Sequence, residues 1–92
     1  LDHPLDLRAE EVRLYDGALP PRYGRPTERV TRALRWTAQS EGLLLDPVYT
    51  GKVMAGLIDL AHMEELAGRR ILFWHTGGQP ALFAYGEHLF GN

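Results

Sequence analysis

The spacing of apolar residues along the chain predicts a first amphipathic helix over residues 27–41. Apolar side chains recur there every three or four residues, which is the period of one helix face. They are Val30, Ala33, Leu34 and Ala38. Thr27 is a favourable N-cap residue, and Gly42 stands where a left-handed C-cap belongs. Both ends of this helix are therefore predicted as well as its apolar face.

A second helix is predicted to begin at Thr50 or Gly51 and to end before Gly68. Its apolar residues cover more than half of its circumference, so we expect it to be largely buried. They are Val53, Met54, Leu57, Ile58, Leu60 and Ala61. A third, short helix is predicted from Pro80, which suits the first helical position, to Tyr85.

Three short segments have the patterns of β-strands. Residues 11–15 alternate between polar and apolar, whereas residues 43–45 and 71–75 are apolar runs bounded by turn residues. Residues 16–26 are rich in glycine and proline and are predicted to form a loop. The resulting order is strand, helix, strand, helix, strand, helix. This order predicts an α/β fold with a parallel sheet.

Two loops are expected to lie where such a sheet binds ligands, beyond the carboxyl ends of its strands. In the loop 46–52, Tyr49 either projects into this crevice to donate or accept a proton or packs into the core. In the loop 75–78, two glycines and free N–H groups beside Thr76 suit an anion or a polar ring. A glycine turn that only allows the chain to enter the last helix explains the same residues.

The composition narrows the function classes. The 92 residues, 45% of them hydrophobic, suffice for one small domain, and a formal charge of -2 provides no basic surface for nucleic acid. The absence of cysteine fits a reducing compartment, so we expect a cytoplasmic protein. The longest apolar runs are too short to cross a membrane. A start at Leu1 without a signal-peptide pattern indicates a piece of a longer chain.

Several single residues have more than one interpretation. Asp59 and His62 lie three apart on a helix but form an incomplete ligand set, so no metal site is expected. His75 fits a satisfied buried histidine better than a catalyst. Lys52, the only lysine, is the only possible Schiff-base former here, although a salt-bridged or solvated lysine is favoured. Tyr23, in the glycine- and proline-rich loop, is either an anchor or a site residue.

Three segments together resemble the family of D-cysteine desulfhydrases and 1-aminocyclopropane-1-carboxylate deaminases. They read EGLLLDPVYTGK over 41–52, AGLIDL over 55–60 and HTGGQPALFAY over 75–85. Their order and spacing follow the family's, and Tyr23-Gly24 also matches. The resemblance extends from about residue 22 to residue 85, and a motif of this length is far more specific than a lone glycine pattern.

This resemblance implies an enzyme dependent on pyridoxal 5'-phosphate (PLP), of fold-type II. The chain would then be a three-layer parallel-sheet fragment of the large PLP-binding domain, like that of the tryptophan synthase β-subunit. Residues 1–92 would form the C-terminal portion of this domain, with a strand and loop over 1–26 and alternating helices and strands over 27–92. The family's Schiff-base lysine and phosphate loop lie upstream, so Lys52 is not the Schiff-base residue.

The resemblance also implies roles for individual residues. Tyr23 and Tyr49 correspond to active-site tyrosines that face the substrate. Thr76 and Thr50 correspond to residues near the cofactor's pyridine ring, with Gly77 beside them. The deaminases typically carry Glu at the position of Thr50 and Leu at that of Thr76, whereas the desulfhydrases carry small hydroxyl residues. Both positions favour a desulfhydrase.

The implied reaction is the β-elimination of D-cysteine to pyruvate, ammonia and hydrogen sulfide. The alternatives are the deaminase, an L-cysteate sulfo-lyase of the same family, or a non-catalytic fragment that binds a partner. The chain alone lacks the Schiff-base lysine and is expected to be inactive. Its implied partners are a small amino-acid substrate, the remaining or complementary chain that carries the lysine, and a second copy in a homodimer. Neither nucleic acid nor membrane is expected.

Overall fold

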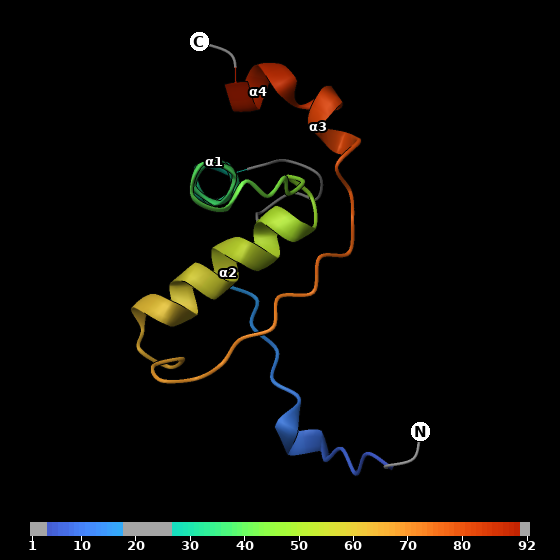
Figure 1. The fold of residues 1–92 in the computed structure, drawn as a ribbon, viewed down its shortest axis with the longest axis vertical. Helices are drawn as coiled ribbons and strands as arrows, with labels where there is room; N and C mark the ends of the chain where they lie inside the picture. Colours follow the sequence, from blue (N-terminus) through green and yellow to red (C-terminus); the bar gives the residue numbers. More distant parts are fainter. Residues whose placement is uncertain (1–3, 18–26, 91–92) are drawn as a thin grey trace.

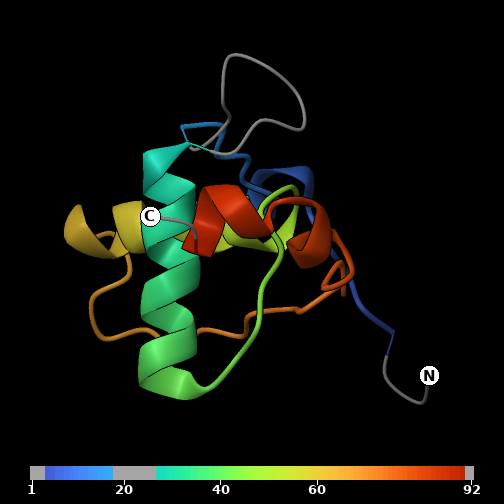
Figure 2. The ribbon, with the colours of Figure 1, turned by 90° about the horizontal axis from the view of Figure 1, so that it is seen from above.

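The computed structural model describes residues 4–17 and 27–90, and every regular element within them is helical. The two long helices are α1 (Glu28–Glu41) and α2 (Thr50–His62). The short elements are η1 (Ala9–Glu11), α3 (Ala81–Ala84) and α4 (Gly86–Phe90). The long helices cross one another, and α4 lies against α1 (Figure 1; Figure 2). None of the helices in these ranges is long and apolar enough to cross a membrane.

The first predicted helix is confirmed together with both of its caps. The Oγ1 atom of Thr27 accepts a hydrogen bond from the N–H of Val30 at 3.3 Å. Gly42 has a φ of 68° and donates its N–H to the carbonyl oxygen of Ala38. A left-handed C-cap of this kind suits glycine because it lacks a Cβ atom. The helix α1 therefore begins and ends where its sequence predicts.

The second predicted helix begins at Thr50, as expected, but it is not largely buried. Its buried residues are Thr50, Gly51, Ala55 and Gly56. An added Cβ at Gly51 would stand 2.9 Å from Leu34 Cδ1, so this end of α2 packs tightly on α1. The opposite side of α2 is open, and Val53 is 57% exposed there. The helix ends at His62, and turns connect it to Gly68.

The predicted parallel-sheet fold is wrong, because the described ranges 4–17 and 27–90 contain helices and no β-strand. Two of the predicted strands, residues 43–45 and 71–75, form no ladder. In the third, residues 11–15, Glu11 belongs to η1 and residues 12–15 lie in no regular element. A strand requires a neighbour whose backbone groups pair with its own. The hydrogen bond that joins the two apolar runs is made by a side chain, from His75 to the Leu44 carbonyl oxygen. The apolar pattern of a segment does not report whether such a partner strand exists.

A small core lies where α1, α2 and α4 meet. Its buried apolar residues are Val30, Ala33, Leu34, Leu45, Ala55 and Leu89. The predicted third helix appears as α3, one turn long, followed by α4. The guanidinium of Arg35 in α1 clasps α4 by donating from Nε, at 2.9 Å, and from Nη2 to the carbonyl oxygen of Leu89. The C-terminal helix is thereby tied to α1.

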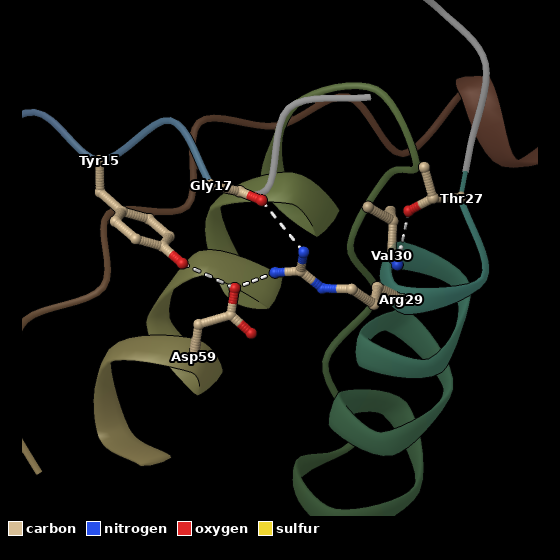
Figure 3. Close-up of polar contacts among 6 residues, drawn as sticks. All are labelled: Tyr15, Gly17, Thr27, Arg29, Val30 and Asp59. Atoms are coloured by element: carbon tan, nitrogen blue, oxygen red, sulfur yellow. Dashed lines mark hydrogen bonds and ion pairs between the residues drawn. The ribbon is translucent and has the colours of Figure 1, made fainter. Parts of the chain in front are cut away.

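The N-terminal segment is held against both long helices by a polar cluster (Figure 3). The phenol of Tyr15 donates to the Asp59 carboxylate of α2 at 2.9 Å. Arg29 of α1 forms an ion pair with the same carboxylate and donates to the Gly17 carbonyl oxygen at 3.0 Å. Asp59 is therefore a structural link between the segment and the two helices.

Candidate functional site

The loop that enters α2 is organised by the buried carboxylate of Asp46. Its Oδ2 atom accepts hydrogen bonds from the N–H groups of Val48 at 2.8 Å and Tyr49 at 2.7 Å. Its Oδ1 atom accepts from the N–H of Thr50 at 2.9 Å and from the Thr50 hydroxyl at 2.7 Å. N–H groups at the start of a helix have no partner within the helix. Asp46 supplies these partners from outside α2.

The backbone of Asp46 also forms hydrogen bonds with the first turn of α2. The N–H of Asp46 donates to the Thr50 hydroxyl oxygen at 2.8 Å, and the carbonyl oxygen of Asp46 accepts from the N–H of Gly51 at 2.7 Å. Pro47, which is buried, has no N–H that would need a partner. Side chain and backbone of Asp46 are thus both bonded to the first turn of α2.

These contacts lower the pKa of Asp46. Burial acts in the opposite direction, since it disfavours the charged form, but it is outweighed by hydrogen bonds to the carboxylate. The bonds come from the Thr50 hydroxyl and from the backbone N–H groups of Thr50, Tyr49 and Val48. Asp46 is therefore a carboxylate at neutral pH, and its negative charge lies near the positive end of α2.

The second loop is held by the imidazole of His75. The Nδ1 atom accepts a hydrogen bond from the N–H of Gly77 at 3.1 Å, and Nε2 lies 2.9 Å from the carbonyl oxygen of Leu44. A carbonyl oxygen can only accept, so Nε2 is the donor in this contact. Both ring nitrogens are thereby used, as expected of a satisfied histidine, but His75 is half-buried and not buried as predicted.

The two loops touch at Asp46 and Gly78. An added Cβ at Gly78 would stand 2.5 Å from Oδ1 of Asp46 and 2.6 Å from its Cγ, so the loop backbone lies directly on the carboxylate. Gly77 and Gly78 have φ values of 99° and 96°, which favour glycine. The structure therefore brings together the two sequence-predicted loops without a sheet between them.

Four of the five predicted site residues lie in these joined loops. Tyr49 is 56% exposed and Thr76 is exposed, whereas Gly77 is half-buried. Thr50 is buried, and its hydroxyl is bonded to Asp46 as both donor and acceptor. The fifth, Tyr23, lies outside the described residues.

Sequence reasoning missed Asp46, which it treated only as part of a turn. The signal was an aspartate just ahead of a predicted helix with a threonine four residues later. Among residues 4–17 and 27–90, no three His, Cys, Asp or Glu side chains gather as metal ligands would. Asp59, once paired with His62 as a possible ligand, is bonded to Tyr15 and Arg29 instead.

The fold and the loops define a class of site in which two helix-entry loops, carrying hydroxyl side chains and glycines, join through a buried carboxylate. No family model matches the chain. It is 52% identical over 87 residues to the D-cysteine desulfhydrase of Klebsiella pneumoniae (strain 342), an alignment of 92% of this chain and 26% of that protein. The D-cysteine desulfhydrase of Yersinia pestis (strain Pestoides F) is 50% identical over 76 residues, or 82% of this chain and 23% of that protein.

The chain is thus homologous to part of the D-cysteine desulfhydrases, and the resemblance predicted from its loops is confirmed. It spans about a quarter of the length of these curated relatives.

Proposed function

We propose that this chain is the C-terminal portion of the cofactor-binding domain of a PLP-dependent D-cysteine desulfhydrase. The complete enzyme would convert D-cysteine to pyruvate, ammonia and hydrogen sulfide, in the cytoplasm. The observation that supports this most is the contact between the two family-like loops, in which Gly78 lies on the carboxylate of Asp46. Identity of about half to D-cysteine desulfhydrases over most of the chain supports it independently.

The second loop offers groups that suit PLP. Thr76 is exposed, and within the described residues an added Cβ at Gly77 would find only Gln79 Oε1 within 4 Å, at 3.9 Å. The backbone at Gly77 is therefore open to the close approach of a planar ring. A threonine hydroxyl can donate a hydrogen bond to a pyridine nitrogen. Thr76 and Gly77 would hold this side of the cofactor.

Thr50 has a different part in the proposal. Its hydroxyl is occupied by Asp46, so Thr50 would act at the cofactor site by fixing the shape of the first loop. A carboxylate side chain at this position, as in the deaminases, would be buried next to the carboxylate of Asp46. Two adjacent buried negative charges repel strongly. The Asp46 network therefore favours the desulfhydrase over the deaminase.

When bound, PLP supplies an electron sink for charge that develops at the substrate's α-carbon. A neutral Thr76 hydroxyl beside the ring nitrogen does not enforce a pyridinium as a carboxylate would, which suits β-elimination. Tyr49 and Tyr23 would face the substrate. Tyr49 is more than half exposed, and its phenol would orient the substrate by donating its O–H proton to a carboxylate oxygen.

The proposal requires a complementary polypeptide that carries the Schiff-base lysine, and the chain has a surface suited to one. An apolar face on the open side of α2 surrounds a groove, and its members are Val53, Leu57, Leu60, Ile71, Leu72 and Trp74. Leu72 is 86% exposed and Trp74 is 77% exposed. An exposed and largely apolar surface of this kind marks an interaction site. A homodimer of the complete enzyme is also part of the proposal.

A chimera tests this function. Residues 1–92 would replace the matched segment of the Klebsiella pneumoniae D-cysteine desulfhydrase, and the parent enzyme would serve as the control. We expect the purified chimera to show the visible band of bound PLP and to release sulfide from D-cysteine. The panel includes 1-aminocyclopropane-1-carboxylate and L-cysteate. A folded, PLP-bound chimera that is inactive on D-cysteine, or that prefers either of the other substrates, would overturn the proposal.

A further inference from the structure

We infer that Asp46 is a positioning residue that holds Tyr49 and the second glycine loop in one fixed arrangement for the reaction. The inference rests on the proposed function, because it assumes that Tyr49 faces the substrate. It adds a residue that does not itself touch substrate or cofactor. Asp46 is fully buried, so it can act only through the groups packed around it.

On one side, Asp46 fixes the backbone from which Tyr49 projects. Its Oδ2 atom accepts the N–H of Tyr49 at 2.7 Å and that of Val48 at 2.8 Å. The side chain of Tyr49 is more than half exposed, so core packing does little to set its direction. Any shift of the backbone that the carboxylate holds would therefore displace the phenol of Tyr49 with it.

On the other side, the same carboxylate limits how far the second loop can approach. An added Cβ at Gly78 would stand 2.5 Å from Oδ1, so the backbone of Gly78 rests on the oxygen that also binds Thr50. A second link between the loops is the hydrogen bond from His75, in the second loop, to the carbonyl oxygen of Leu44, just ahead of the first loop. Asp46 thus serves as the common support of both loops.

An amide cannot replace this carboxylate. Both carboxylate oxygens accept two hydrogen bonds each, from four donors in total. Asparagine has the same shape but offers one oxygen, and its NH₂ group would face N–H donors. Substitution of Asp46 by Asn therefore keeps the volume of the side chain and breaks one half of the network.

The test is a double-mutant cycle in the chimera, with Asp46→Asn, Tyr49→Phe and the double variant. We expect Asp46→Asn to lower kcat on the order of 10²-fold while PLP content is retained, because small displacements of a positioned group are costly. In the Tyr49→Phe background the same substitution should lower kcat much less. Asp59→Asn, which removes a carboxylate of the ion pair far along α2, is the matched control and should leave kcat unchanged.

Two results would overturn the inference. One is a kcat for Asp46→Asn equal to that of the chimera, and the other is two effects that multiply fully in the double variant, as independent structural damage would give. If Asp46→Asn does not fold, Thr50→Val replaces it, since it deletes one donor to Oδ1, and Thr50→Ser should restore kcat.

Hydrogen exchange separates this inference from the proposed function, because it needs no turnover. Asp46→Asn should raise amide exchange by about tenfold or more in both loops, residues 46–52 and 75–78, as a lost buried hydrogen-bond network implies. Exchange that rises only in the first loop would refute the shared support, even in an inactive chimera. An active chimera with unchanged exchange would refute the inference and leave the function standing.

Discussion

Gly78 lies so close to Asp46 that a Cβ atom added to it would stand 2.5 Å from the carboxylate oxygen Oδ1. The neighbouring Gly77 has almost the same backbone angle, with a φ of 99° against 96°, but a Cβ added there would meet only Gln79 Oε1, at an ordinary contact distance of 3.9 Å. The two glycines therefore form a natural pair in which backbone strain is matched and only the contact with Asp46 differs.

This pair gives the first prediction. Alanine at either position must adopt a positive φ, which costs about 1–2 kcal/mol. At Gly78 the added methyl group also collides with the carboxylate, which costs about 1–3 kcal/mol more. We expect the melting temperature of the chimera to fall further for Gly78→Ala than for Gly77→Ala. Equal losses would show that the loops are not in contact at Asp46.

The lowered pKa of Asp46 predicts how the first loop responds to acid. A carboxyl group with a native pKa below its unfolded value of about 3.9 stabilises the fold fully at higher pH. This contribution is lost as the pH falls through about 3.9 toward the native pKa. We expect amide protection in residues 46–52, corrected for intrinsic exchange, to fall as the pH drops from about 5 to below about 3.9.

The matched variant for the acid response is Asp46→Asn. It should show weaker protection near neutrality and a flat profile over the same pH range, since it has no proton to gain. A fall in protection as steep as that of the unsubstituted chain would assign the acid response to another group.

A buried hydroxyl in α1 gives the third prediction. Thr31 is 8% exposed, and its Oγ1 atom finds no hydrogen-bond partner in the described part of the chain. A buried polar atom without a partner costs about 1–3 kcal/mol, and valine has nearly the same shape without the hydroxyl. Thr31→Val should raise the melting temperature of the chimera. Thr31→Ser, which keeps the hydroxyl and loses the methyl group, should lower it. A lower melting temperature for Thr31→Val would contradict the finding that the Thr31 hydroxyl has no hydrogen-bond partner among the described residues.

A substitution of Lys52 tests whether this residue forms the Schiff base with PLP. It is the only lysine of the chain, and the family resemblance places the Schiff-base residue elsewhere. In the chimera, Lys52→Met should leave the visible absorption band of PLP unchanged. Loss of the band in a folded variant, together with failure to trap PLP on the protein by borohydride reduction, would make Lys52 the Schiff-base residue after all.

The helices could be predicted from sequence because their signals are local. Thr27 and Gly42 mark the ends of α1, and the residues between them repeat with the helical period. The strand predictions were wrong, because residues 71–75 have the composition of a strand but find no backbone partner in the described residues. Strand formation depends on a neighbour that no local pattern reports.

The candidate site was predicted in part for a similar reason. The loops around Tyr49 and Thr76 stand out in the sequence by their glycines, hydroxyls and family resemblance. Their contact does not, because it depends on the side chain of Asp46 turning inward to meet Gly78. Only the arrangement of the chain in space identifies Asp46 as the residue that the two loops share.

The bond from Arg35 to Leu89 has a practical consequence for the evolution and engineering of this chain. The guanidinium binds a main-chain carbonyl oxygen, which every amino acid possesses. This hydrogen bond therefore requires a carbonyl group at that position and does not depend on the residue type. The enclosed side chain of Leu89 separately demands an apolar residue there. Helices of other sequence could therefore replace α4 on α1, provided that each places an apolar side chain and its carbonyl oxygen where Leu89 has them.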